Sequence, residues 1–304
     1  QGIYKWNGAD PKYFTTYFPG REVVLRQTRR FGKEIYKFSQ IIRRGIFDSV
    51  DKDYVHTEKD SYIKRYLNFN EVPFDQCEGT WYILGRVHSS VTELKMAAKS
   101  SGLYFSDNKG NKSFDSKQWQ AIKSWTTISN GKTITRDAAE NMYRYLRDLK
   151  DYDFRTPKFW QNIPETQTFN FKQLKEWAGL DLNDDQHNQP WWNVLKRNFT
   201  PRQTAYFVLL LKKYGQAKLN QDPRIIIDTI HSVKGGEANN VLLYSKTNWP
   251  ASFSHKTKEE KSDEKRVYYT GVTRAKNTLH ILSTDYKYNY PIGMDYLMYL
   301  QENT

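Results

Sequence analysis

The stretch RIIIDTIHSVKGGEANNVLLY, residues 224–244, decides the fold. It consists of two short, almost continuously apolar runs, Arg224–Ile230 and Asn240–Tyr244, joined by a polar turn with two adjacent glycines. Runs of this length without polar alternation are typical of strands buried on both faces, as in a parallel sheet covered by helices. A polar turn after such a strand lies where open α/β sheets bind ligands.

Comparable runs occur on both sides of this stretch. Strands are predicted at Glu22–Leu25, Thr80–Leu84 and Thr278–Leu282. Apolar residues at helical spacing lie between them, on one face made of Ile35, Phe38, Ile41 and Ile42 and another made of Val91, Leu94 and Ala98. The sequence therefore predicts an α/β fold with a mainly parallel sheet covered by helices. The Lys- and Glu-rich segment Lys256–Lys265 is predicted to be a polar loop before the next helix.

The middle of the chain, residues 113–221, has a different pattern. Helical spacing recurs there, and no run of core strands does. The helical positions are Ala138, Met142, Tyr145 and Leu149, and four tryptophans follow at 160, 177, 191 and 192. We interpret this region as a mostly helical insertion into the α/β domain. Trp191 and Trp192 belong either to the core of the insertion or to a partner surface.

The charge balance favours a polyanionic partner. The chain has 47 Lys and Arg against 34 Asp and Glu, a formal net charge of +13. Such a field attracts nucleic acid, because cations that neutralise phosphates release condensed counterions. A basic surface exposed to solvent gives the same excess of positive charge. The sequence motifs therefore have to decide whether the chain binds nucleic acid.

Cysteine content and hydropathy exclude several other classes of protein. Cys77 is the single cysteine, which excludes an intrachain disulfide and a Cys-rich zinc site. The apolar runs are far shorter than the ~20 residues of a membrane helix, and no signal peptide opens the chain. We expect a soluble protein of a reducing cytoplasm, with no metal-ligand cluster. Because the chain opens at Gln1 rather than Met, we expect it to be part of a longer polypeptide.

Four segments carry side chains suited to nucleotide and nucleic-acid chemistry. They are QGIYKWNGAD at 1–10, LRQTRR at 25–30, DTIHSVKGGE at 228–237 and DEKRVYYTGVTRA at 263–275. A Gln can hydrogen-bond a γ-phosphate or its attacking water, aromatic faces stack on bases, and a fixed guanidinium stabilises charge in phosphoryl transfer. Each segment also has a structural interpretation: Tyr4 and Trp6 as core residues, the pair Arg29 and Arg30 as a solvated strand end, His231 as a structural histidine, and Arg274 as the partner of a surface carboxylate.

In order and content the four segments resemble motifs III, IV, V and VI of UvrD-like superfamily 1 DNA helicases. The resemblance is good over about residues 1–45 and 222–285 and weak between them. It departs from the family at three positions: Asn7 stands where Arg is usual, Arg29 where an aromatic residue is usual, and Gly236 where an apolar residue is usual.

The resemblance implies residues for an ATP site. Gln1 would sense the γ-phosphate, Arg30 and Arg274 would be the arginine fingers, and Glu237 would bind the ribose. Arg29 would stack on adenine in place of the usual aromatic residue, since a guanidinium plane can also stack. Gly235 belongs to the same motif as Glu237.

The resemblance also implies contacts to single-stranded DNA. Tyr4 and Trp6 would be base-stacking platforms, and Thr229 and His231 would lie toward the DNA backbone. Arg86, with His88, follows the predicted strand at 80–84, where a similar strand, turn and helix of the family places an Arg near DNA. In the fourth segment, by contrast, Glu264 and Arg266 are predicted to form ion pairs within their helix.

No Walker A motif occurs in the chain. The segment Thr126–Thr133 ends like a P-loop but lacks its first glycine and a preceding buried strand, so we interpret it as a turn. The resemblance accordingly divides the chain into the end of a first motor domain (1–20), a second RecA-like domain, 2A (21–112 and 222–304), and an insertion in the position of subdomain 2B (113–221). The P-loop and the Mg²⁺ ligands would lie in an N-terminal domain that precedes Gln1.

The function implied is the C-terminal motor portion of an ATP-dependent DNA helicase, with 3′-to-5′ polarity. Its cofactor would be ATP with Mg²⁺, and its partners single-stranded DNA, single-strand/double-strand junctions and the N-terminal RecA-like domain. The chain alone is predicted to be inactive as an ATPase. The alternative is a non-catalytic module on a helicase-like fold that binds single-stranded DNA or a protein partner.

Overall fold

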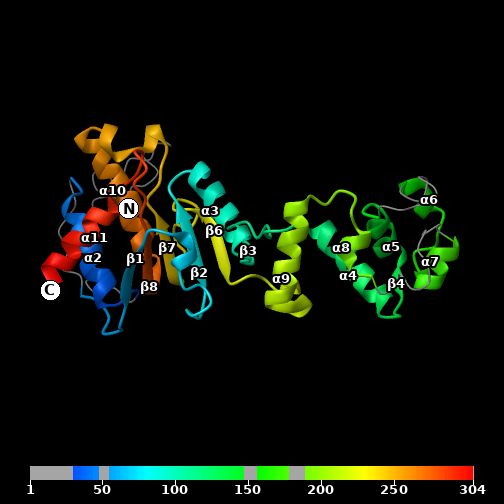
Figure 1. Ribbon diagram of the computed structural model, residues 1–304. Helices are drawn as coiled ribbons and strands as arrows, with labels where there is room; N and C mark the ends of the chain where they lie inside the picture. The colour runs from blue at the N-terminus through cyan, green and yellow to red at the C-terminus, as the bar shows by residue number, and fades with distance from the viewer. Residues whose placement is uncertain (1–29, 48–54, 147–155, 178–188, 304) are drawn as a thin grey trace, which may run out of the picture. The chain divides into compact units, whose positions relative to one another are not determined.

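The computed structural model describes residues 30–47, 55–146, 156–177 and 189–303. The chain divides into two compact units, which we call the sheet unit (1–111 with 221–304) and the helical unit (112–220) (Figure 1). Every residue of the candidate sites described below belongs to the sheet unit.

The sheet unit is built on six strands in the order β1-β8-β7-β2-β6-β3, and all neighbouring pairs are parallel. The strands are β1 (Tyr62–Tyr66), β2 (Trp81–Gly85), β3 (Phe105–Ser106), β6 (Ile225–Thr229), β7 (Ala238–Tyr244) and β8 (Ala275–Leu282). Alternate residues of the central strands enter different cores, since Val241 and Leu243 pack on one side and Leu242 packs on the other. Burial on both faces explains why these strands are apolar without alternation.

Helices cover both faces of this sheet (Figure 1). Helices α2 (Lys33–Arg44), α10 (Lys258–Val272) and α11 (Ile292–Asn303) pack on one face, and α3 (His88–Ser100) packs on the other. The short 3₁₀ helices are η2 (Phe69–Glu71), η5 (Trp249–Ala251) and η6 (Phe253–His255). The predicted α/β fold with a helix-covered parallel sheet is confirmed.

The predicted core elements agree with the observed ones. The strands expected from residues 80, 224, 240 and 278 onward are β2, β6, β7 and β8, and both predicted apolar helix faces are buried. The strand predicted at 22–25 lies outside the described residues. Strand β1 was not predicted, because it is an edge strand whose first four residues stay partly or fully exposed. The two-residue β3 is too short to leave a pattern.

The prediction of a polar loop at Lys256–Lys265 is wrong. Helix α10 begins at Lys258 and continues through this segment. Its N-cap Thr257 accepts a hydrogen bond from the Glu260 amide, and the Glu260 carboxylate accepts one from the Thr257 amide. This capping box satisfies amide groups that a helix start leaves unpaired, so a charged segment can begin a helix.

The helical unit contains α4 (Ser116–Ser129), α5 (Arg136–Tyr143), α6 (Pro157–Gln161), α7 (Phe171–Trp177), α8 (Trp191–Val194) and α9 (Pro201–Asn220). Strands β4 (Ile134–Thr135) and β5 (Thr168–Phe169) form a small antiparallel pair. Trp191 is buried against Phe199 and Phe207, whereas Trp192 is 41% exposed. Trp191 therefore belongs to the core of this unit. The P-loop-like segment is the end of α4 and a turn with Gly131 in the left-handed region.

A buried histidine of the sheet links stability to pH. His280 on β8 stacks on Trp81 with ring centroids 4.8 Å apart, its Nδ1 lies 3.2 Å from the Tyr66 hydroxyl, and its Nε2 has no hydrogen-bond partner in the described part of the chain. Burial, with a smaller contribution from the charge of Lys64, lowers the pKa of His280 from 6.5 to about 4. The ring is therefore neutral in the folded protein at neutral pH.

We expect this histidine to destabilise the fold in acid. Since its folded pKa is lowered, the full stability is present above pH 6.5 and falls as the unfolded chain takes up the proton between pH 6.5 and 4, by about 3 kcal/mol. Urea unfolding of the unaltered chain and of His280→Phe across this range measures the effect. The variant should lose that part of the pH dependence, and an equal pH slope in both proteins would refute the assignment.

Candidate functional site

Four of the residues predicted for the sites lie outside the described residues: Gln1, Tyr4, Trp6 and Arg29. The others lie in two places of the sheet unit, one at the amino end of β7 and the other at the carboxyl end of β6. The first place surrounds Glu237, and the second is a pocket between β6 and α3.

Glu237 lies between two cations at the start of β7. Its Oε2 is 3.3 Å from Nε of Arg30, just before α2, and its Oε1 bonds to Nζ of Lys276 on β8. The hydrogen bond from Lys276, together with the charges of Lys276 and Arg30, holds the pKa of Glu237 below its ordinary value. All three side chains are between a third and two fifths exposed, so a ligand can reach them.

Arg274 lies beside these residues but is turned inward. It is 2% exposed, and its three guanidinium nitrogens donate to the Thr270 carbonyl (Nε, 3.1 Å), the Gly236 carbonyl (Nη1, 3.0 Å) and the Thr273 hydroxyl (Nη2, 3.3 Å). Burial and the nearby charge of Arg30 lower the pKa of Arg274 to about 10. The side chain is thus a cation at neutral pH. We call Arg30, Glu237, Arg274 and Lys276 the Glu237 cluster.

The paired glycines shape the turn before Glu237. Gly235 has φ +95°, in the left-handed region that favours glycine, so a side chain there would strain the backbone. A Cβ on Gly236 would lie 2.5 Å from the Tyr82 hydroxyl. The Tyr82 side chain thus occupies the space that the usual apolar residue of the family would need.

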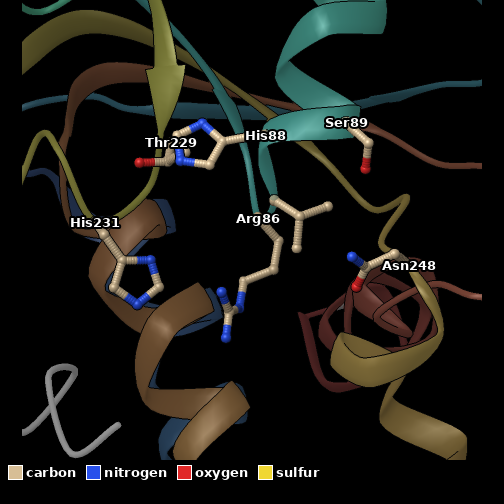
Figure 2. A pocket seen from close by; sticks show the side chains of 7 residues that line it. Arg86, His88, Ser89, Thr229, His231 and Asn248 are labelled. Carbon is tan, nitrogen blue, oxygen red and sulfur yellow. The ribbon is translucent and has the colours of Figure 1, made fainter. Parts of the chain in front are cut away.

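The second place is a pocket of about 450 Å³ (Figure 2). Its lining comes from the start of α3, the end of β6 with the following turn, and the segment after β7: Arg86, Val87, His88, Ser89, Thr229, His231 and Asn248. Thr229 is 8% exposed, and its hydroxyl accepts a hydrogen bond from the Ser232 amide (3.2 Å). The structure thus brings together the predicted DNA contacts Arg86, Thr229 and His231.

Arg86 forms an ion pair with a residue on another element of the sheet unit. Its Nε and Nη2 donate to the two carboxylate oxygens of Glu264 on α10, at 2.7 and 2.8 Å. Burial alone would lower the pKa of Arg86, but the hydrogen bonds and charge of Glu264 outweigh it and raise the pKa. The prediction of an ion pair within the helix is wrong for Glu264, because its carboxylate is buried and faces Arg86. It is correct for Arg266, which pairs with Asp263 at 2.9 Å.

The pocket has the polarity expected of a site for anions. Arg86 is charged, and His88 and His231 add donors or acceptors according to their protonation. Helix α3 also begins at the pocket, and its N-cap Val87 supplies no side-chain cap. Amide groups in the first turn of a helix favour phosphate groups.

Sequence reasoning missed Lys276, Ser89 and Asn248. Lys276 lies two residues after Arg274 on the next strand, so its proximity to Glu237 depends on the pairing of β7 with β8. Ser89 directly follows His88 in the sequence. Asn248 comes from a segment that carries no motif, and no sequence signal pointed to it.

None of the described helices is both long and apolar enough to cross a membrane. Within the same ranges, no group of three or more His, Cys, Asp and Glu side chains is placed to hold a metal ion.

A comparison with protein families finds a match that covers most of the chain. The family model of the UvrD-like helicase C-terminal domain matches residues 52–286, which is more than two thirds of the chain. The matched range contains the pocket and the residues Glu237, Arg274 and Lys276. No curated protein matches the chain. The sheet topology and this match together place the chain in the family of UvrD-like helicase C-terminal domains.

Proposed function

We propose that this chain is the second motor domain of an ATP-dependent DNA helicase, with ATP at the Glu237 cluster and single-stranded DNA at the pocket. One observation carries the proposal: a single turn connects the two places. Thr229 and His231 line the pocket at the start of this turn, and Glu237 and the Gly236 carbonyl belong to the cluster at its end. A nucleotide-dependent shift of the turn would therefore act directly on the DNA contacts.

The Glu237 cluster fits a nucleotide by its charges. Arg30, Lys276 and Arg274 supply cations for the phosphates, and the Glu237 carboxylate supplies acceptors for the ribose hydroxyls. Bound ATP with Mg²⁺ supplies the phosphoryl-transfer chemistry, and the P-loop and Mg²⁺ ligands are assigned to another domain. Gln1 and Arg29 are assigned to the same site from the sequence. In this proposal Arg274 must exchange its bond to the Gly236 carbonyl for one to the γ-phosphate.

The proposal assigns the remaining parts of the chain as follows. Residues 1–20 end the first motor domain, 21–112 with 222–304 form domain 2A, and 113–221 take the place of subdomain 2B. Tyr4 and Trp6 stack on bases of the strand whose backbone lies in the pocket. The polarity is 3′ to 5′, and the substrates include single-strand/double-strand junctions.

The pocket assignment predicts a loss of DNA affinity in Arg86→Gln. A charge-assisted hydrogen bond to phosphate is removed, so we expect the Kd for a fluorescent single-stranded oligonucleotide to rise about tenfold. The slope of log K against log salt should also fall by about one. Arg44→Gln is the matched control, because Arg44 is exposed on α2 and pairs with Glu302 away from the pocket. Equal affinities for the two variants would contradict the assignment.

The chain alone should have no significant ATPase activity. The cations of the Glu237 cluster can stabilise charge on a phosphoryl group, but the chain has no P-loop to hold one. A coupled assay for ADP release, with and without single-stranded DNA, measures this. DNA-stimulated turnover that Arg274→Ala abolishes would mean that the phosphate-binding half has been misplaced.

A second candidate function is a binding module without catalysis. It is favoured by Arg274, whose guanidinium nitrogens all donate within the chain, and by the departures at Asn7 and Arg29. The two candidates differ in what accompanies the chain. A P-loop and an Asp-Glu pair encoded just upstream of Gln1 would support the motor, and an unrelated domain there would support the module.

A further inference from the structure

The ion pair between Arg86 and Glu264 connects the pocket to helix α10. Glu264 is 3% exposed, and its carboxylate receives both hydrogen bonds from Arg86 and lies 3.5 Å from Nζ of Lys256. A buried carboxylate without partners would be strongly destabilising, so Glu264 depends on these two cations. The arrangement leaves one positive charge in excess beside the pocket.

The geometry of this ion pair leaves one nitrogen of the Arg86 guanidinium available to a ligand. Glu264 takes Nε and Nη2, whereas Nη1 makes no hydrogen bond among the described residues. Arg86 lines the pocket, with Thr229 and His231 on neighbouring elements (Figure 2). A guanidinium that donates two hydrogen bonds to one carboxylate loses rotational freedom, but it keeps a donor for a phosphate oxygen.

We propose that Glu264 is a positioning residue for DNA binding, which holds Arg86 by a two-point clamp and thereby presents Nη1 to a phosphate of the strand in the pocket. The inference rests on the proposed function of the pocket. It goes beyond that function because it assigns a role in DNA binding to Glu264, a buried carboxylate that the DNA does not contact.

The clamp and simple electrostatics predict opposite results for Glu264→Gln. Removal of a negative charge beside the pocket should tighten binding to a polyanion if charge alone matters. If the clamp matters, binding should weaken, because the amide cannot accept both hydrogen bonds and Arg86 is released. We expect the Kd of the 304-residue chain for a single-stranded oligonucleotide to rise about five- to tenfold at fixed salt.

A matched control lies on the same helix. Glu259 is exposed in the first turn of α10, so Glu259→Gln makes the same change of charge without touching Arg86. This variant should bind DNA equally well or slightly more tightly. Glu264→Asp keeps the charge but shortens the side chain by one methylene, and we expect it to weaken binding less than Glu264→Gln.

A double variant separates positioning from a general loss of structure. If Glu264 acts through Arg86, Glu264→Gln should have no further effect on Kd in an Arg86→Gln background. Removing both partners also avoids leaving Arg86 or Glu264 as an unpaired buried charge, so this double variant stays informative even if Glu264→Gln alone unfolds. Thermal unfolding by circular dichroism establishes which variants are folded.

The outcomes distinguish this inference from the proposed function. Equal or tighter binding by a folded Glu264→Gln would overturn the clamp, as would a further loss of affinity from Glu264→Gln in the Arg86→Gln background. Either result leaves the pocket as a DNA site. If the unaltered chain binds no single-stranded DNA, the proposed function of the pocket is refuted, and the clamp is refuted with it.

Discussion

Replacing Arg274 by alanine is expected to lower kcat for ATP hydrolysis by about 10³-fold or more, in a longer protein that joins this chain to a Walker-bearing domain. A guanidinium at the transferred phosphoryl group stabilises charge that develops in the transition state. DNA affinity should change little, because Arg274 lies with the Glu237 cluster and does not line the pocket. Steady-state ATPase kinetics with saturating DNA, together with a DNA-binding titration, measure both quantities.

Two controls separate catalysis from stability in this variant. Arg274 also bonds to the Gly236 and Thr270 carbonyls, so its loss could loosen the turn, and thermal unfolding should be measured alongside the kinetics. Arg266→Ala removes another arginine of the same helical region, one that pairs with Asp263 outside the cluster, and should keep most of the activity. A loss confined to DNA binding in Arg274→Ala would contradict the assigned role.

Replacing Trp81 by alanine is expected to destabilise the sheet unit by about 3–5 kcal/mol. Trp81 is fully buried on the central strand β2, where it lies against Phe74 and stacks on His280. Its removal leaves a large cavity between the sheet and its helices, which the surrounding side chains can fill only in part. Urea unfolding followed by far-UV circular dichroism measures the change in the free energy of unfolding.

An exposed tryptophan of the same unit is the comparison for this experiment. Trp249 is 58% exposed, so Trp249→Ala removes the same side chain with much less lost burial. We expect a small change in stability, within about 1 kcal/mol. If both variants were equally destabilised, the packing described for β2 would be wrong.

The sequence predicted the buried part of the fold because burial leaves a pattern. Strands β6 and β7 contain the uninterrupted apolar runs 225–227 and 241–243 because both of their faces are covered, and the apolar face of α2 has helical spacing. Elements with little burial leave a weak pattern, and the edge strand β1 was missed for this reason. The start of α10 was missed although its signal, Thr257 followed three residues later by Glu260, stands in the sequence.

Motifs in the sequence pointed to some residues of the candidate site. They could not point to pairs of side chains that come from different helices and strands. The resemblance to helicase motifs singled out Arg30, Glu237 and Arg274, and these three side chains lie near one another in the structure. The resemblance could not predict that Arg274 turns toward the Gly236 carbonyl, because a rotamer depends on local packing. Nor could it predict the pair of Arg86 with Glu264, whose partners are 178 residues apart and meet only in the folded sheet unit.

The most direct measurement of the central claim is a crystal structure, with ADP and a planar phosphate mimic, of a protein that joins this chain to a Walker-bearing domain. We predict that the nucleotide lies along the Glu237 cluster, with the Arg274 guanidinium released from the Gly236 carbonyl and about 3 Å from the oxygens or fluorines of the mimic. A nucleotide bound elsewhere, or an Arg274 that keeps its bonds to Gly236 and Thr270 beside the mimic, would contradict the account.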